Sequence, residues 1–325
     1  MRPDRLRWAA AWVIASLLLA LCFRGVDIRG LVVLVAGAHP IWLGAALSAN
    51  TTILLLWATQ WWWLLPRARP VPFRCMLGVT AVMAMVANSV PFLAGQAAGV
   101  HLLATRGSIG HAGALSVAAL DQLAEGIAKV TMLLVLATLA PLPPSLATAL
   151  NLLAMAVALL LTIVVVAAWS HGRLWISTSL GRMHPGIARF VTEWAAGLEG
   201  ARRPTVLAGG VLLALTMKGA ELTGILTVQF ALGVDLPAWS ALAVLAAVSL
   251  STMVSAAPAN LGVYEGSAFL AYQALGATPE TALALGVVQH ALYLIPMAGA
   301  GWLAVTLGRR ESHGALAAMT ESAGN

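Results

Sequence analysis

The chain has 325 residues, of which 60% are hydrophobic and only 9% are charged, and its formal net charge is +6. A soluble domain of this size requires far more polar surface, and several apolar runs reach the length of about 20 residues that spans a hydrocarbon core. The arginines lie mainly between these runs, so we attribute the basicity to membrane topology and expect no nucleic-acid partner.

Six apolar runs are candidates for membrane-spanning helices. They cover residues 8–23, 40–65, 109–139, 145–169, 204–231 and 279–308. Arginine clusters precede the first run, follow the second, fill the segment before the fifth and end the last. These clusters are consistent with one another if all of them face the cytoplasm. We therefore expect a multi-pass protein of the bacterial inner membrane with both termini in the cytoplasm.

Two further apolar segments, residues 75–93 and 238–257, each end in a helix-breaking motif. The first motif reads PFLAGQAAG and the second reads PANLGVYEG, so both follow the pattern P-x3-G-x3-G. The paired positions are Pro91 with Pro258, Gly95 with Gly262, and Gly99 with Gly266, and the second motif also contains Asn260. Because a long apolar run follows each copy, the pattern predicts an internal duplication.

Each broken segment is interpreted as a re-entrant hairpin, and the arginine distribution predicts that the two hairpins enter from opposite sides of the membrane. The sequence therefore predicts an all-α polytopic membrane protein with about six spanning helices and two re-entrant hairpins in an inverted repeat. This is the pattern of alternating-access transporters, whose sites lie where the broken segments meet. The alternative is that both segments span fully and that their glycines serve close helix packing.

The expected organisation follows this repeat within a single integral membrane domain, residues 1–325. Its parts are an N-terminal helix and interfacial segment (1–39), a first repeat (40–139), a connecting helix and cytoplasmic amphipathic loop (140–203), a second repeat (204–310) and a disordered tail (311–325).

Ionisable residues inside the apolar runs predict a substrate-binding site, because a charge in the membrane costs several kcal/mol unless it is paired or hydrated. One helical face of the third run carries three of them at i, i+4 and i+8, and two more lie one turn apart on the fifth run. The predicted site residues are Asp121, Glu125, Lys129, Lys218, Glu221, Glu265 and His290. The alternative is that these residues form salt bridges that only hold helices together.

Motifs of soluble-enzyme chemistry are absent from the sequence. It contains no G-x-x-x-x-G-K-[ST] phosphate loop, no H-E-x-x-H, no paired cysteines for zinc and no G-x-S-x-G elbow. We expect no catalytic residues, no metal site, no cofactor and no enzymatic activity. Any transport would have to be downhill, ion-coupled or assisted by a partner.

Three stretches carry a resemblance to a known family: NSVPFLAGQAAGVHLLATRG, SVAALDQ and APANLGVYEGSAFLAYQALGATPETALALGVVQHALYL. They resemble the transmembrane region of lysylphosphatidylglycerol synthases and related flippase-like proteins, including the hopanoid-associated HpnL group, from about residue 40 to 308. The family motif near P-G-x-L-G-V-x-E is matched at Pro258, Leu261, Gly262, Val263 and Glu265. The chain departs from the family at Ala259, Gln96 and His290, where Gly, an acidic residue and Arg are common.

The resemblance implies an inner-membrane protein that moves or handles lipids. In the full-length synthases, aminoacyl transfer belongs to a separate soluble C-terminal domain. Only residues 309–325 follow Gly308 here, so we expect no catalytic domain.

Our main hypothesis is a lipid flippase or lipid transporter of the cell envelope that moves an anionic, amino- or isoprenoid-type lipid through a polar groove between the repeats. Lys129 and Lys218 would attract phosphate, and the acidic residues would bind cationic or hydroxyl-rich groups or relay protons. The alternatives are a non-transporting accessory protein of envelope-lipid biosynthesis, such as hopanoid biosynthesis, and an ion-coupled carrier of a small solute. Expected partners are membrane lipids, with an envelope-lipid biosynthetic enzyme and a second copy of the chain as further candidates.

Overall fold

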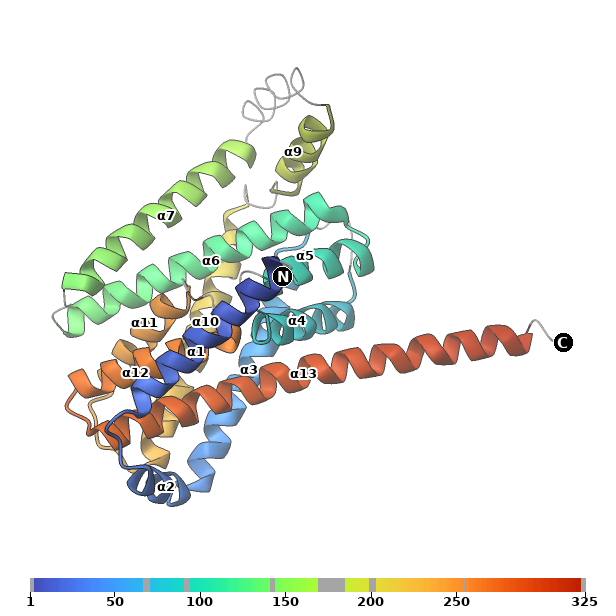
Figure 1. Ribbon diagram of the computed structural model, residues 1–325. Helices are drawn as coiled ribbons and strands as arrows, with labels where there is room; N and C mark the ends of the chain where they lie inside the picture. The colour runs from blue at the N-terminus through green and yellow to red at the C-terminus, as the bar shows by residue number, and fades with distance from the viewer. Residues whose placement is uncertain are drawn as a thin grey trace.

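The computed structural model is all-helical over the residues that it describes (Figure 1). These are residues 3–66, 71–90, 94–140, 144–168, 185–198, 203–253, 255 and 257–322. The chain begins with α1 (Pro3–Phe23) and a short helix α2 (Ile28–Ala36). Asp27 caps α2, because its side chain accepts a hydrogen bond from the Arg29 amide at 3.0 Å.

The two halves of the chain have the same order of elements: a long helix, two short helices and a second long helix. In the first half these are α3 (Pro40–Trp63), α4 (Phe73–Ala87), α5 (Ala94–Arg106) and α6 (Gly110–Leu139). In the second half they are α10 (Pro204–Ala231), α11 (Trp239–Met253), α12 (Val263–Ala274) and α13 (Pro279–Ser322). This shared order is what a duplication would produce.

The packing of the helices also repeats from one half to the other. The first long helices, α3 and α10, pack against each other along their length. The second long helix of each half packs against the first long helix of the other half, because α6 contacts α10 and α13 contacts α3. Within each half the two short helices pack together, and the second of them packs against the long helix that follows. The interior is therefore built where the halves meet.

Helices α7 (Pro144–Ala168) and α9 (Pro185–Gly197) connect the halves and lie along one side of α6 (Figure 1). The Ser116 hydroxyl on α6 donates a hydrogen bond to the Trp194 carbonyl on α9 at 2.8 Å. Within the predicted amphipathic loop, residues 169–184 and 199–202 lie outside the described residues.

Four helices are long and apolar enough to cross a membrane, among the residues that the structure describes. They are Pro40–Trp63, Gly110–Leu139, Pro204–Ala231 and Pro279–Leu307, which match four of the six predicted spans. Helices α1 and α7 cover the other two predicted spans, and the apolar stretches described within them are Ala11–Phe23 and Asn151–Val164. The structure is thus a multi-pass helical membrane protein, and the count of six spans stays a prediction.

The last helix extends well beyond the other helices at its C-terminal end (Figure 1). It continues to Ser322, across residues for which the sequence predicts a disordered tail.

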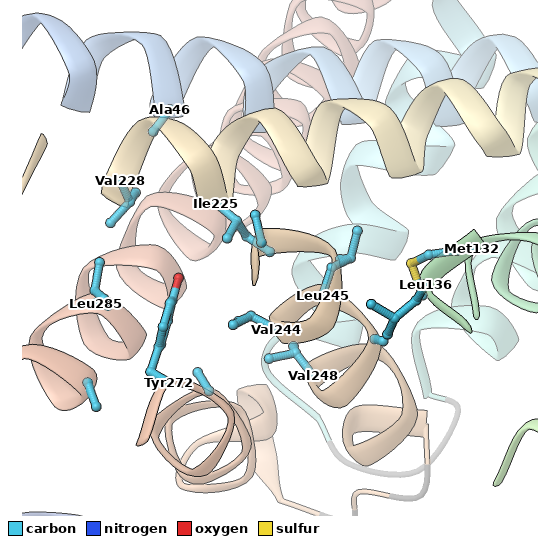
Figure 2. Close-up of a cluster of buried hydrophobic side chains, with 14 of the residues drawn as sticks. Ala46, Met132, Leu136, Ile225, Val228, Val244, Leu245, Val248, Tyr272 and Leu285 are labelled. Carbon is cyan, nitrogen blue, oxygen red and sulfur yellow. The ribbon is translucent and has the colours of Figure 1, made fainter. Parts of the chain in front are cut away.

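A buried apolar cluster fixes the second pair of short helices against the rest of the protein (Figure 2). Side chains from seven helices meet in it, and the largest fully buried member is Tyr272 of α12. Three members, Ile225, Leu245 and Val248, also line the cavity described below. The same packing that anchors α11 and α12 therefore forms one wall of that cavity.

Candidate functional site: a charged cavity between the halves

The second helix break is a sharp turn in the backbone. Pro258 begins a single 3-10 turn, and the next positions include Ala259 at φ 53° and Asn260 at φ 55°. Non-glycine residues seldom adopt positive φ, and each costs of the order of 1–3 kcal/mol. Gly262 follows at φ 78° and starts α12. Residues 238–275 are thus not one continuous helix, and the predicted break is confirmed.

Glu265 ties this turn to the helix that follows it. Its Oε2 atom accepts a hydrogen bond from the Gly262 amide at 2.7 Å, and the carboxylate lies in the first turn of α12, where a negative charge is favourable. Gly262 also touches α1, because an added Cβ would lie 2.7 Å from the Ala15 carbonyl oxygen. Only glycine satisfies both the positive φ and this contact.

The first break uses its glycines differently. Pro91 lies outside the described residues, but Gly95 and Gly99 are both buried within helix α5. An added Cβ at Gly95 would lie 2.5 Å from Ala87 Cβ, and one at Gly99 would collide with the Met83 side chain. These two glycines therefore permit close packing of α5 on α4.

A cavity of about 280 Å³ lies where the two halves meet. Side chains from both halves line it, including Gln96 from the first broken segment and Asn260 from the second. Six of the seven predicted site residues line this cavity: Asp121, Glu125, Lys129, Lys218, Glu221 and His290. The structure thus brings together charges that are scattered over the sequence.

Lys218 is the centre of an ionic network in the cavity. Its Nζ lies 2.7 Å from Glu125 Oε1 on α6, and 2.9 Å and 3.0 Å from the two carboxylate oxygens of Glu221 on α10. Lys218 therefore contacts three carboxylate oxygens from two helices. Lys129 pairs with Glu125 at 3.2 Å. The two pairs within one helix were predicted, whereas the pair between α6 and α10 was not.

Asp121 is the third carboxylate of the cavity lining, which contains two lysines, Lys129 and Lys218. It is 2% exposed and accepts a hydrogen bond from the Gln122 side chain at 3.1 Å. Carboxylates therefore outnumber ammonium groups in the cavity lining.

Glu265 is not among the residues that line the cavity, but it contacts His290, which is. His290 Nδ1 lies 2.6 Å from Glu265 Oε1, and both side chains are buried. The Tyr264 ring stacks on the imidazole with a centroid separation of 4.2 Å and an interplanar angle of 5°. Glu265 thus orients His290, and His290 is the member of the pair that faces the cavity.

Sequence reasoning based on charge missed the uncharged polar residues of the lining. Gln96, Gln122 and Gln289 all line the cavity, and each stands within an apolar helix. An amide side chain inside an apolar run is the signal that could have identified them, because burial of a polar group is unfavourable without a partner.

No cluster of three or more His, Cys, Asp or Glu residues able to hold a metal ion occurs in the described part of the chain. The side chains that line the cavity can bind a polar group and exchange hydrogen bonds or protons with it.

Comparison with known proteins identifies one family. The sequence model of the lysylphosphatidylglycerol synthase TM region matches residues 8–301, which is most of the chain. No curated protein and no solved structure matches this chain.

Proposed function

Because the chain belongs to the lysylphosphatidylglycerol synthase transmembrane-region family, we propose that it is a lipid flippase or lipid transporter of the bacterial inner membrane. The observation that carries this proposal is the cavity, which is charged, lies within the membrane-spanning helices and is lined from both halves at their two breaks. Ionisable groups inside membrane-spanning helices are rare, and they commonly mark substrate or ion pathways.

In this proposal the headgroup enters the cavity and the acyl or isoprenoid chains stay in the surrounding lipid. A headgroup loses its hydration when it crosses hydrocarbon, and the polar lining replaces part of that hydration. The two broken segments act as re-entrant hairpins, which supply irregular backbone where a cavity satisfies it. Both termini face the cytoplasm, and the chain is not itself an enzyme.

Movement between the leaflets requires the cavity to open to each side in turn. Lys218 and Glu125 form the ion pair that joins the two halves among the described residues. Alternating access therefore involves rearrangement at the contact between α6 and α10, with Glu221 holding Lys218 while Glu125 is released.

The test is reconstitution of the full chain into liposomes that contain fluorescent lipids with different headgroups. A membrane-impermeant reductant bleaches the outer leaflet, so bleaching beyond that fraction reports movement across the bilayer. We expect protein-dependent movement of at least one lipid, and a loss of about tenfold in rate for Asp121→Asn, which removes the charge but keeps the shape.

Two controls accompany this experiment. Empty liposomes give the background rate, and Leu159→Ala on the exposed face of α7 is expected to leave the rate unchanged. If no lipid in the panel moves faster with protein than without it, the accessory role in envelope-lipid biosynthesis replaces the transport proposal.

A further inference from the structure

We propose that Gln289 and His290 form a subsite that binds a hydroxyl of the lipid headgroup, so that the cavity selects a neutral, hydroxyl-rich headgroup over a phosphate or an ammonium group. This inference rests on the proposed function for the claim that the ligand is a lipid, and it deepens that function by naming the headgroup chemistry.

His290 lines the cavity, and one of its two ring nitrogens is committed to the protein. The side chain is 2% exposed, and its Nδ1 atom contacts Glu265. Its Nε2 atom is buried and has no hydrogen-bond partner among the described residues. Stacking on Tyr264 fixes the plane of the ring. Because Glu265 and Tyr264 already fix the orientation of the His290 ring, little conformational entropy is lost when a ligand binds.

Gln289, the preceding residue, is arranged in the same way. It is 3% exposed, and its Nε2 atom donates to the Tyr272 hydroxyl. Gln229 Nε2 also bonds this hydroxyl, at 3.1 Å, and lies 3.3 Å from Ser240 Oγ. Figure 2 shows the Tyr272 hydroxyl pointing toward α10, the helix that carries Gln229. The Gln289 Oε1 atom has no partner in the described structure, although it is buried.

The two buried atoms without a hydrogen-bond partner, His290 Nε2 and Gln289 Oε1, define the chemistry of the subsite. With the Nδ1 proton donated to Glu265, a neutral imidazole presents Nε2 as an acceptor, and Gln289 presents its amide oxygen as another. Leaving such buried groups unpaired costs about 1–3 kcal/mol each, so a ligand that donates hydrogen bonds is favoured here. A fully ionised phosphate has no donor to offer.

An ammonium group has donors but is a poorer match than a hydroxyl. Both free acceptors are uncharged, and the nearby Glu265 carboxylate is already bonded to His290 and to the Gly262 amide. A cation would lose its hydration without gaining a free carboxylate at this subsite, and that loss is larger than for a hydroxyl. A hydroxyl also remains complementary if one of the two protein groups acts as a donor, because it both donates and accepts.

The ionic side of the cavity does not favour a phosphate either. Lys218 is already in contact with the Glu125 and Glu221 carboxylates, and Asp121, Glu125 and Glu221 outnumber the lysines. An incoming anion would be repelled by these carboxylates.

The test is binding of lipids with identical acyl chains and different headgroups to the purified full chain in detergent, measured by native mass spectrometry. The probes are monoglucosyl diacylglycerol, phosphatidic acid and phosphatidylethanolamine. We expect the glucosyl lipid to bind about tenfold more tightly than either phospholipid, the difference made by about one well-placed buried hydrogen bond. Tighter binding of phosphatidic acid or phosphatidylethanolamine overturns the proposal.

A matched pair of variants separates the subsite from the stability of the fold. Gln289→Met and Gln229→Met each remove one hydrogen bond to Tyr272, but only Gln289 lines the cavity. We expect Gln289→Met to weaken binding of the glucosyl lipid about tenfold and Gln229→Met to leave it unchanged. Equal weakening by both variants, or by neither, contradicts the subsite.

The role of Glu265 as a positioning residue has its own spectroscopic test. In protein labelled with ¹⁵N-histidine, the His290 signals, identified by their loss in His290→Gln, should show a neutral ring protonated at Nδ1. Glu265→Gln offers an amide donor to Nδ1, so the proton should move to Nε2. A doubly protonated ring at neutral pH in the unaltered protein overturns the assignment of Nε2 as an acceptor.

These results are independent of the transport assay. Transport of an amine lipid that Gln289→Met does not slow would leave the flippase proposal standing and remove the subsite. Selective binding of the glucosyl lipid without movement of any lipid would do the reverse.

Discussion

The two broken segments share the pattern P-x3-G-x3-G, yet the structure uses their glycines for different purposes. In the first segment, Gly95 and Gly99 lie within α5 and let it approach α4 closely. In the second, Gly262 turns the backbone at φ 78°, and its amide binds Glu265. A repeated motif therefore preserves the order of the elements, while the chemistry around each copy has diverged.

The positions of the charged groups also differ between the two halves. The first half supplies Asp121, Glu125 and Lys129 on its second long helix. The second half supplies Lys218 and Glu221 on its first long helix and the contact of Glu265 with His290. The halves are thus similar in architecture, and they are joined at the pair between Lys218 and Glu125.

Loss of the ion pair between Lys218 and Glu125 should have the largest effect on stability. Lys218→Met removes the cation paired with Glu221 and one of the two paired with Glu125, so that two partly buried carboxylates are left with Lys129 alone. Removal of one partner of a buried ion pair costs about 3–5 kcal/mol, and we expect a loss of this order in the free energy of unfolding, measured by denaturant titration in detergent micelles.

The control is the double variant Lys218→Met/Glu221→Gln, which should recover part of the loss because Glu221 loses its partner in Lys218→Met whereas Glu125 keeps Lys129. Exchange of Lys218 and Glu221 is a poor control, since it would place a carboxylate at position 218 beside Glu125. If Lys218→Met were as stable as the unaltered protein, the halves would not be joined by this charge.

The turn of the second segment can be tested against a glycine with the same conformation and no close neighbours. Gly262→Ala combines positive φ with contacts at 2.7 Å to the Ala15 carbonyl oxygen and Leu18 Cβ, whereas Gly233, at φ 64°, has no atom within 4 Å of an added Cβ. We expect Gly262→Ala to lower the unfolding free energy by about 3 kcal/mol and Gly233→Ala by about 1–2 kcal/mol. Equal losses would show that α1 does not constrain the turn.

The packing role of the first segment should give a smaller effect. Gly95→Ala places a methyl group 2.5 Å from Ala87 Cβ, so overpacking should cost about 1–3 kcal/mol. Gly78 on α4 has open space, and Gly78→Ala should be neutral or stabilise by up to about 1 kcal/mol, because alanine favours helix. Thermal melts of both variants decide this, and a stabilised Gly95→Ala would contradict the packing role.

Much of this architecture follows from local sequence patterns. Apolar runs identify the four long helices, and proline and glycine identify both breaks, because these signals depend only on neighbouring residues. The same holds for the pair of Glu125 with Lys129 and that of Lys218 with Glu221, whose spacing places them on one helical face.

Contacts between helices could not be read in this way. The pair of Lys218 with Glu125 and the pair of His290 with Glu265 depend on how separate helices pack. The position of α1 over Gly262 likewise follows from tertiary packing, because nothing in an apolar helix specifies which partner it covers. Gln289 was missed for a related reason, since its importance comes from a buried atom without a partner, which is a property of the folded state.

The smallest effect is expected where the second segment meets α1. A Cβ at position 266 would lie 3.5 Å from the Sγ of Cys22, which is close to disulfide geometry. In a Cys75→Ser background, Gly266→Cys should therefore cross-link to Cys22 on oxidation, detected as a mass loss of two hydrogens, whereas Gly78→Cys, with open space around it, should stay reduced. Because Gly262 already packs tightly on α1, we expect α1 and α12 to move as one unit, so that the cross-link leaves lipid movement unchanged. Loss of movement on oxidation and its recovery with a reductant would instead show that α12 slides along α1, and the hinge of the protein would then lie at this contact and not between α6 and α10.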